Sequence, residues 1–184
     1  MGTDSRRRAF ISMVLAAASF LAVLEVMAER GGESAPKQET SWVSSLHEMD
    51  QAISRGDLMA AATARREGYR AAIGSRTWEG FLAAGDAVLR LGDATQSRAA
   101  AEPDARRLYL AALFRARSQS SLDGVLLATE AFARLGDREV VAQGLSLAAG
   151  LAGSDPAAQA RVLGVADRSS REAMAAGDRG EDGL

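Results

Sequence analysis

The chain has 184 residues, 47% of them hydrophobic and only 5% aromatic, and its formal net charge is −2. This near-neutral charge provides no overall field that would attract nucleic acid. The absence of cysteine and the single histidine, His47, exclude disulfides, cysteine nucleophiles and metal sites built from several such ligands in one chain. The Ala-rich composition with three prolines favours helices.

An apolar stretch over residues 9–27 directly follows three arginines at residues 6–8. As a helix it would be about 28 Å long, close to the roughly 30 Å hydrocarbon core of a bilayer. We therefore assign residues 1–28 to a transmembrane signal anchor of a bacterial inner membrane. The arginines place the N-terminus in the cytoplasm and the remaining chain in the periplasm. The alternative is a signal peptide cleaved after Ala28, but the apolar run is longer than a usual signal core.

Residues 29–40 are rich in Gly, Ser and Glu and have no apolar periodicity, which predicts a flexible linker. A folded domain is predicted over residues 41–175. The Gly- and Asp-rich tail at residues 176–184 is predicted to be disordered.

Apolar residues recur at helical spacing through most of the predicted domain. The expected helices cover residues 41–54, 58–73, 78–90, 103–117, 122–135, 138–151 and 157–174. Residues 94–102 are polar and Ala-rich, and we assign them to an insertion or one short helix. Most of the predicted inward-facing residues form clear stripes, such as Leu46 and Met49 in the first helix. The residues expected to face inward are Leu58, Met59, Ala62, Tyr69, Ala72 and Ile73 in the second helix, and Leu163 and Ala166 in the last.

Three Gly-Asp pairs separate apolar patterns: Gly56-Asp57, Gly92-Asp93 and Gly136-Asp137. At each pair, Gly is expected to end one helix and Asp to cap the next. The pairs are 36 and then 44 residues apart. This repetition predicts a series of helix–turn–helix units.

The small residues around these pairs resemble the tetratricopeptide repeat, a 34-residue unit of two antiparallel helices. Gly85 lies seven residues before Gly92, with bulky Phe81 four residues earlier, and Ala61 follows Gly56 by five. Gly144 and Ala148 occupy further positions where the family has small residues. The first helix departs from the pattern at Met49, and residues 94–102 interrupt the middle unit. The resemblance implies an all-α antiparallel solenoid of about seven helices. The alternative is a plain helical bundle.

The candidate partner-binding residues are arginines on the second and fourth predicted helices. They are Arg65, Arg66 and Arg70 on the second helix, and Arg106, Arg107, Arg115 and Arg117 on the fourth. In stacked helix pairs one set of helices lines a groove, where arginines can bind carboxylates in bidentate fashion. The alternative is a solvated outer surface. His47 is interpreted as a surface residue, because no second His or Cys is present to complete a site.

No cofactor, metal site or catalytic residue is predicted, and the chain is not expected to be an enzyme. We predict a membrane-anchored, periplasm-facing scaffold that binds a membrane-associated protein or peptide partner. Such a scaffold would act as an adaptor, assembly factor or accessory subunit of a membrane or secretion complex. The alternatives are a purely structural small subunit of a membrane complex and a periplasmic helical binding protein released from its signal peptide.

Overall fold

The computed structural model describes residues 35–181, which form seven α-helices and no strand. The helices are α2 (Ala35–Ser54), α3 (Leu58–Ser75), α4 (Trp78–Ala94), α5 (Arg98–Ser118), α6 (Leu122–Arg134), α7 (Arg138–Ala152) and α8 (Pro156–Glu181). The all-α class predicted from the sequence is confirmed for this part of the chain. The predicted membrane span at residues 9–27 lies outside the described residues. Among the helices within 35–181, none is both long enough and apolar enough to cross a bilayer.

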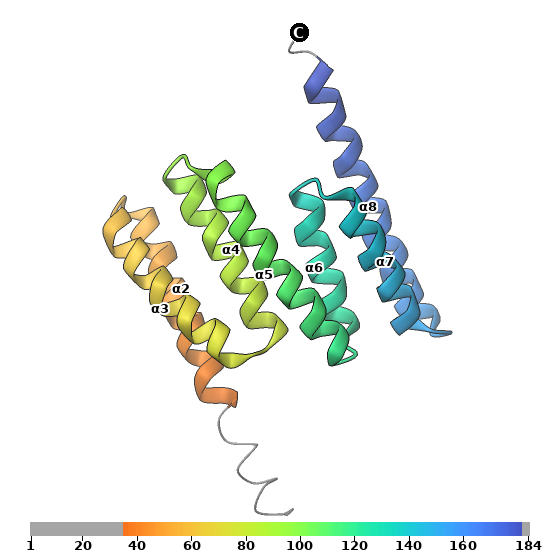
Figure 1. Ribbon diagram of the computed structural model, residues 1–184, viewed down its shortest axis with the longest axis horizontal. Helices are drawn as coiled ribbons and strands as arrows, with labels where there is room; N and C mark the ends of the chain where they lie inside the picture. Colours follow the sequence, from red (N-terminus) through yellow and green to blue (C-terminus); the bar gives the residue numbers. More distant parts are fainter. Residues whose placement is uncertain (1–34, 182–184) are drawn as a thin grey trace, which may run out of the picture. The chain divides into compact units, whose positions relative to one another are not determined.

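The helices lie in two rows, which we call the odd row (α3, α5 and α7) and the even row (α2, α4, α6 and α8). From α3 to α8 each helix packs against the next, and α4 and α8 also contact α6. An ion pair between Asp50 and Arg90 joins α2 to α4. In Figure 1, α2 lies behind α3 and α8 lies behind α7. The chain therefore alternates between the rows as it proceeds.

The turns that lead from the even row to the odd row share one geometry. Gly56, Gln96 and Gly136 all have left-handed backbone, with φ of 75°, 56° and 76°, and their positions are 40 residues apart in both steps. The amide after each of them donates to the carbonyl five residues earlier, at 2.9, 2.7 and 3.1 Å. This is the Schellman arrangement that satisfies carbonyls at the end of a helix.

The prediction of a turn at Gly92-Asp93 is wrong, because α4 continues through both residues to Ala94. The turn comes later, at Gln96, so the internal spacing is 40 residues twice instead of 36 and 44. Gly92 has a different role, since a Cβ atom there would lie 2.8 Å from the Cβ of Ala101 on α5. A side chain at Gly92 would push α4 and α5 apart.

Residues 94–102 are also not an insertion, because α5 begins at Arg98. Alanine is the strongest helix former, and three alanines follow Arg98. Arg98 pairs with Asp93 at 2.7 Å and Glu102 at 3.8 Å, which supports this first turn. Pro103 lies inside the helix and does not start it, although it removes one backbone donor.

Both ends of the helical region extend beyond the predicted bounds. α2 begins at Ala35, inside the predicted linker at residues 29–40. Pro36 is compatible with a first helical turn, and the following Lys, Gln and Glu are good helix formers. α8 continues to Glu181, within the predicted tail at residues 176–184, because Ala and Met carry the helix forward from Ala173.

The predicted inward face of α3 is confirmed at Ala72 but wrong at three larger residues. Leu58, Met59 and Tyr69 are 40%, 81% and 38% exposed, whereas Ala61, Ala64, Gly68 and Ala72 are buried. Small residues face the neighbouring helices because the helices approach closely. A Cβ atom on Gly68 would lie 2.7 Å from Leu46 Cδ2 on α2. Apolar character alone assigned the larger side chains to the wrong side of this helix.

The remaining inward faces follow the prediction more closely. Met49, Tyr109, Val125 and Thr129 are the largest fully buried side chains. In α8 the prediction is wrong, because Leu163 is 69% exposed. The buried residues of α8 are instead Ala158, Val162, Val165 and Ser169.

Replacing Gln96 by Gly is expected to raise the free energy of unfolding by about 0.5–1 kcal/mol. A side chain at φ of 56° is strained, and relief of this strain exceeds the added chain entropy of unfolded Gly. The reverse change at the matching turn, Gly56→Gln, should lower stability by a similar amount. Urea denaturation followed by circular dichroism measures both. Equal or lower stability of Gln96→Gly would contradict the assigned backbone.

Candidate functional site

The predicted arginines lie on α3 and α5, both in the odd row. These two helices carry Arg65, Arg66, Arg70, Arg98, Arg106, Arg107, Arg115 and Arg117 against Glu67, Glu102 and Asp104. By contrast, α4 and α6 of the even row carry Arg90 and Arg134 against Glu79, Asp86, Asp93, Asp123 and Glu130. The odd row is therefore the basic side of the fold.

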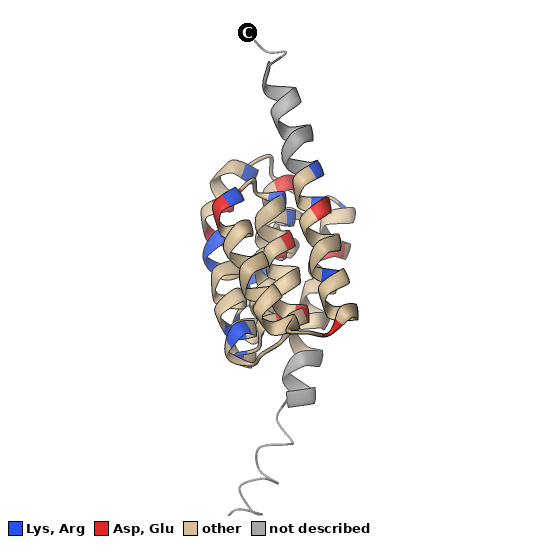
Figure 2. Cartoon of the chain, turned by 90° about the vertical axis from the view of Figure 1, so that its right-hand side faces the viewer, with Lys and Arg blue, Asp and Glu red and all other residues tan. Residues whose placement is uncertain are grey.

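The even row carries ion pairs between its own helices. The pairs are Asp50–Arg90 between α2 and α4, Asp86–Arg134 between α4 and α6, and Asp123–Arg161 and Glu130–Arg168 between α6 and α8. Figure 2 shows acidic and basic residues close together at several points of the fold. These carboxylates and guanidinium groups are therefore engaged within the row.

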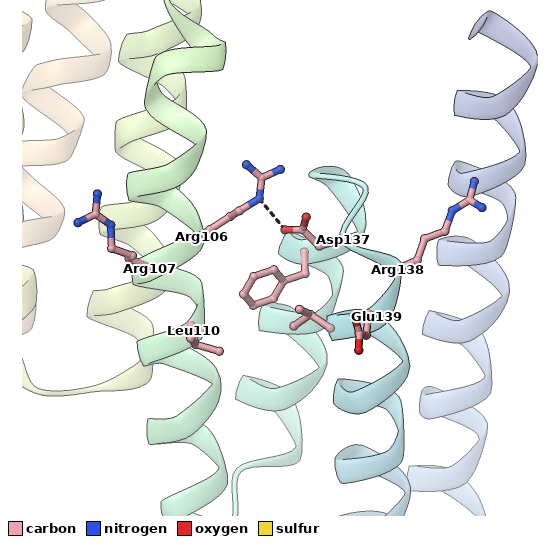
Figure 3. A pocket seen from close by; sticks show the side chains of 8 residues that line it. Arg106, Arg107, Leu110, Asp137, Arg138 and Glu139 are labelled. Atoms are coloured by element: carbon pink, nitrogen blue, oxygen red, sulfur yellow. Dashed lines mark hydrogen bonds and ion pairs between the residues drawn. The ribbon is translucent and has the colours of Figure 1, made fainter. Parts of the chain in front are cut away.

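A groove with a volume of about 420 Å³ lies between α5 and α7, over the turn that begins α7. Its lining residues are Arg106, Arg107, Leu110, Phe132, Asp137, Arg138, Glu139 and Val140. Leu110, Phe132 and Val140 form the apolar part of this lining. Figure 3 shows Leu110 together with the charged residues of the lining. An apolar floor with a charged rim is typical of a site that holds a side chain of a binding partner.

Arg106 fastens α5 to the turn between α6 and α7. Its Nε donates to Asp137 at 2.8 Å (Figure 3), and its Nη2 donates to the carbonyl of Leu135 at 3.3 Å. Glu102 lies 3.3 Å from its Nη1. The hydrogen bond to Asp137, followed by the charges of Asp137 and Glu102, raises the pKa of Arg106 against the opposing effect of desolvation. Arg106 thus acts as a clasp between α5 and the turn that precedes α7.

Arg107 is placed differently and belongs to an exposed stripe. We call Arg107, Leu110, Phe114 and Arg117 the α5 stripe. These residues recur at steps of three, four and three, so they share one face of α5. Leu110 and Phe114 are 41% and 58% exposed, and the side chain of Arg107 is 77% exposed beside Asp104.

Sequence reasoning missed Leu110 and Phe114 as functional residues. The buried stripe of α5 consists of Ala105, Leu108, Tyr109, Ala112, Leu113 and Ala116. Leu110 and Phe114 are four residues apart and fall outside that stripe, which is the signal that could have identified them. An exposed apolar pair between two arginines favours contact with another molecule.

The other predicted arginines do not line the groove. Arg65 lines a separate hollow of about 240 Å³ between α3, α4 and α5. Arg66 donates to Thr63 at 3.4 Å on its own helix, and Arg70 is exposed on the same helix. Arg115 is partly buried on α5 and is absent from the groove lining. The structure therefore brings together only Arg106 and Arg107 of the predicted set.

A second hollow, of about 690 Å³, lies between α6 and α8. Trp78, Leu126 and Leu127 contribute to its apolar lining. The ion pairs that join α6 to α8 involve four of its lining residues. Charged groups at this hollow are thus paired between two helices, whereas Arg107 of the α5 stripe pairs only within its own helix, with Asp104.

His47 is exposed on α2, and its Nε2 lies 2.9 Å from Nε2 of Gln51. Within the part of the chain that the structure describes, no group of three or more His, Asp or Glu side chains is placed to hold a metal ion.

Comparisons with family models, curated proteins and solved structures find no match for this chain. The candidate site is therefore defined by the groove and the α5 stripe.

Proposed function

We propose that this chain is an interaction scaffold that binds a protein segment along the groove between α5 and α7 and the adjoining α5 stripe. The observation that carries this proposal is the exposed Leu110–Phe114 pair beside an apolar groove with a charged rim. A few buried anchor residues, most often aromatic side chains and arginines, provide most of the binding energy in protein interfaces. No catalytic step is assigned to the chain.

The scaffold is proposed to be a tetratricopeptide-like array of paired helices. The alternation between two rows and the regular 40-residue spacing of Gly56, Gln96 and Gly136 support this assignment. The unit is longer than the 34 residues of the repeat that the sequence resembles, so the proposal concerns the paired-helix architecture and not the length of the repeat. In such arrays each unit buries its apolar side against its neighbours.

Residues 9–27 are proposed to anchor this array in a bacterial inner membrane, with residues 41–175 in the periplasm. The length and apolar character of the stretch, together with the three preceding arginines, support this topology. The scaffold would then act as an adaptor, assembly factor or accessory subunit beside a membrane complex. A purely structural small subunit and a periplasmic protein released from its signal peptide remain the alternative proposals.

A photo-crosslinking amino acid at position 114 of the full chain, in native membranes, tests the scaffold. We expect one discrete crosslinked partner from position 114 and none from position 163, a matched exposed site on α8 where Leu163 is 69% exposed. Leu110→Ala should reduce the product about tenfold, since an interface anchor contributes about 1–2 kcal/mol or more. Equal products from positions 114 and 163, or no effect of Leu110→Ala, would contradict the proposed site.

A further inference from the structure

The α5 stripe has an apolar centre and one arginine at each end. Arg107 and Arg117 are ten residues apart, which corresponds to about 15 Å along a helix axis. Leu110 and Phe114 lie between them and are exposed. A partner that covers this stripe must therefore place apolar side chains over its centre. At each end it must place a group that can lie beside a guanidinium group.

We propose that the α5 stripe binds an amphipathic helix in which two apolar side chains lie between two carboxylates. The proposal rests on the scaffold function given above and specifies the chemistry of its partner. The matching helix carries a carboxylate, an apolar residue, a second apolar residue and a second carboxylate at steps of three, four and three. Because the stripe is symmetric in charge, the helix can lie in either direction along α5.

The charge of the surroundings favours an acidic partner. α3, α5 and α7 with its N-cap Asp137 together have nine arginines and five acidic residues, since Arg138, Asp137 and Glu139 add to those named above. The nearest acidic partner of Arg107 is Asp104 at 2.6 Å, and both side chains are more than 60% exposed. Such exposed pairs contribute little, so a carboxylate of the partner can replace Asp104. Arginine binds carboxylates through two parallel hydrogen bonds, which adds orientation to attraction.

The shape of this surface favours a helix. The α5 stripe borders the groove between α5 and α7, and Leu110 belongs to both. A helix lying over the α5 stripe would direct a side chain into this groove, toward Leu110, Phe132 and Val140. Helix-in-groove binding uses anchors at steps of three and four residues, which are the steps found in the α5 stripe.

Two synthetic helical peptides of about 16 residues, or four turns, provide the test. One carries Glu and Leu in the proposed pattern, and the other has Lys in place of Glu. Fluorescence anisotropy measures binding to the full chain in nanodiscs of neutral lipid. We expect the Glu peptide to bind at least about tenfold more tightly than the Lys peptide, and Arg107→Glu/Arg117→Glu to reverse this preference. Equal binding of both peptides to the native chain would overturn the acidic partner.

The matched control is Arg66→Glu/Arg70→Glu, which makes the same charge change on α3. We expect it to weaken binding of the Glu peptide less than about threefold, and a loss as large as that of the α5 variant would overturn the assignment to the stripe.

If Phe114→Ala weakens both peptides equally and no charge preference exists, the acidic partner is wrong while the scaffold function stands. If Phe114→Ala also has no effect, the scaffold site itself is wrong. In anionic nanodiscs, crosslinking from position 114 to lipid and not to the Glu peptide would overturn the proposal in favour of a membrane surface.

Discussion

Replacing Tyr109 by Ala is expected to lower the free energy of unfolding by about 3–5 kcal/mol, the range for removal of a large buried aromatic ring. Tyr109 is 0% exposed. Its ring meets Phe132 edge-on with the centroids 5.9 Å apart. Its hydroxyl donates to Asp86 Oδ1 at 2.7 Å, and Arg134 donates to the same oxygen at 3.2 Å. The residue thus connects α4, α5 and α6 at one point.

Tyr109→Phe separates the ring from the hydroxyl. It should lower stability by only about 1–2 kcal/mol, because it removes one hydrogen bond to a carboxylate and leaves the packing unchanged. Burial, the hydrogen bond to Asp86 and its charge raise the pKa of Tyr109 well above its ordinary value. The unfolded phenol therefore ionises first, and the native chain should lose stability relative to Tyr109→Phe as the pH rises above about 10. Urea denaturation across this pH range measures the difference. If Tyr109→Ala lowers the free energy of unfolding by less than about 1 kcal/mol, the result would contradict the burial of this ring between α4, α5 and α6.

The sequence predicts the buried face of α6 better than that of α3 for a physical reason. Helices such as α6 bury large apolar side chains, including Val125, Leu126 and Phe132, and these produce a clear periodic signal. The buried face of α3 is instead made of Ala and Gly. Small residues contribute little to an apolar pattern, even where they permit the closest packing. The exposed Met59 and Tyr69 then dominate the apolar pattern of α3, so the predicted inward face is displaced toward them.

The turns show a second limit of sequence reasoning. Gly56 and Gly136 adopt the left-handed conformation that glycine favours, so their prediction as helix ends is confirmed. At the middle turn Gln96 adopts this conformation and Gly92 provides space between α4 and α5. A glycine can either end a helix or provide space between two helices, and only the three-dimensional arrangement distinguishes these two roles. Sequence reasoning therefore placed the middle turn four residues too early.

The candidate site was predictable only as a region. Arginine content identified α5, but Arg106 and Arg107 are adjacent in sequence and differ in role. Arg106 reaches Asp137, which is 31 residues away in the chain, so its role as a clasp depends on how α5 meets the following turn. Phe114 was recognisable only once the buried face of α5 was known. The side proposed to bind a partner is the part of α5 that the fold does not bury.

Gly85→Ala is expected to lower the free energy of unfolding by about 1–2 kcal/mol, although Ala is intrinsically better than Gly in a helix by about 1 kcal/mol. A Cβ atom at Gly85 would lie 2.5 Å from Cε1 and 2.8 Å from Cδ1 of Tyr109. The ring is held by Phe132 and Asp86 and cannot move aside without strain, so overpacking of about 2–3 kcal/mol outweighs the gain in propensity.

The sign of this effect should reverse when the ring is absent. In a Tyr109→Ala background, Gly85→Ala is expected to raise the free energy of unfolding by about 0.5–1 kcal/mol, since only the helix propensity of Ala remains. Gly150→Ala on α7 is the matched control, because a Cβ atom there meets nothing within 4 Å, and it should stabilise the native chain by a similar amount. Urea denaturation of the four variants in the cycle measures the coupling between the two sites. Destabilisation by Gly85→Ala of the same size in both backgrounds would show that its cause lies within α4 and not in the contact with Tyr109.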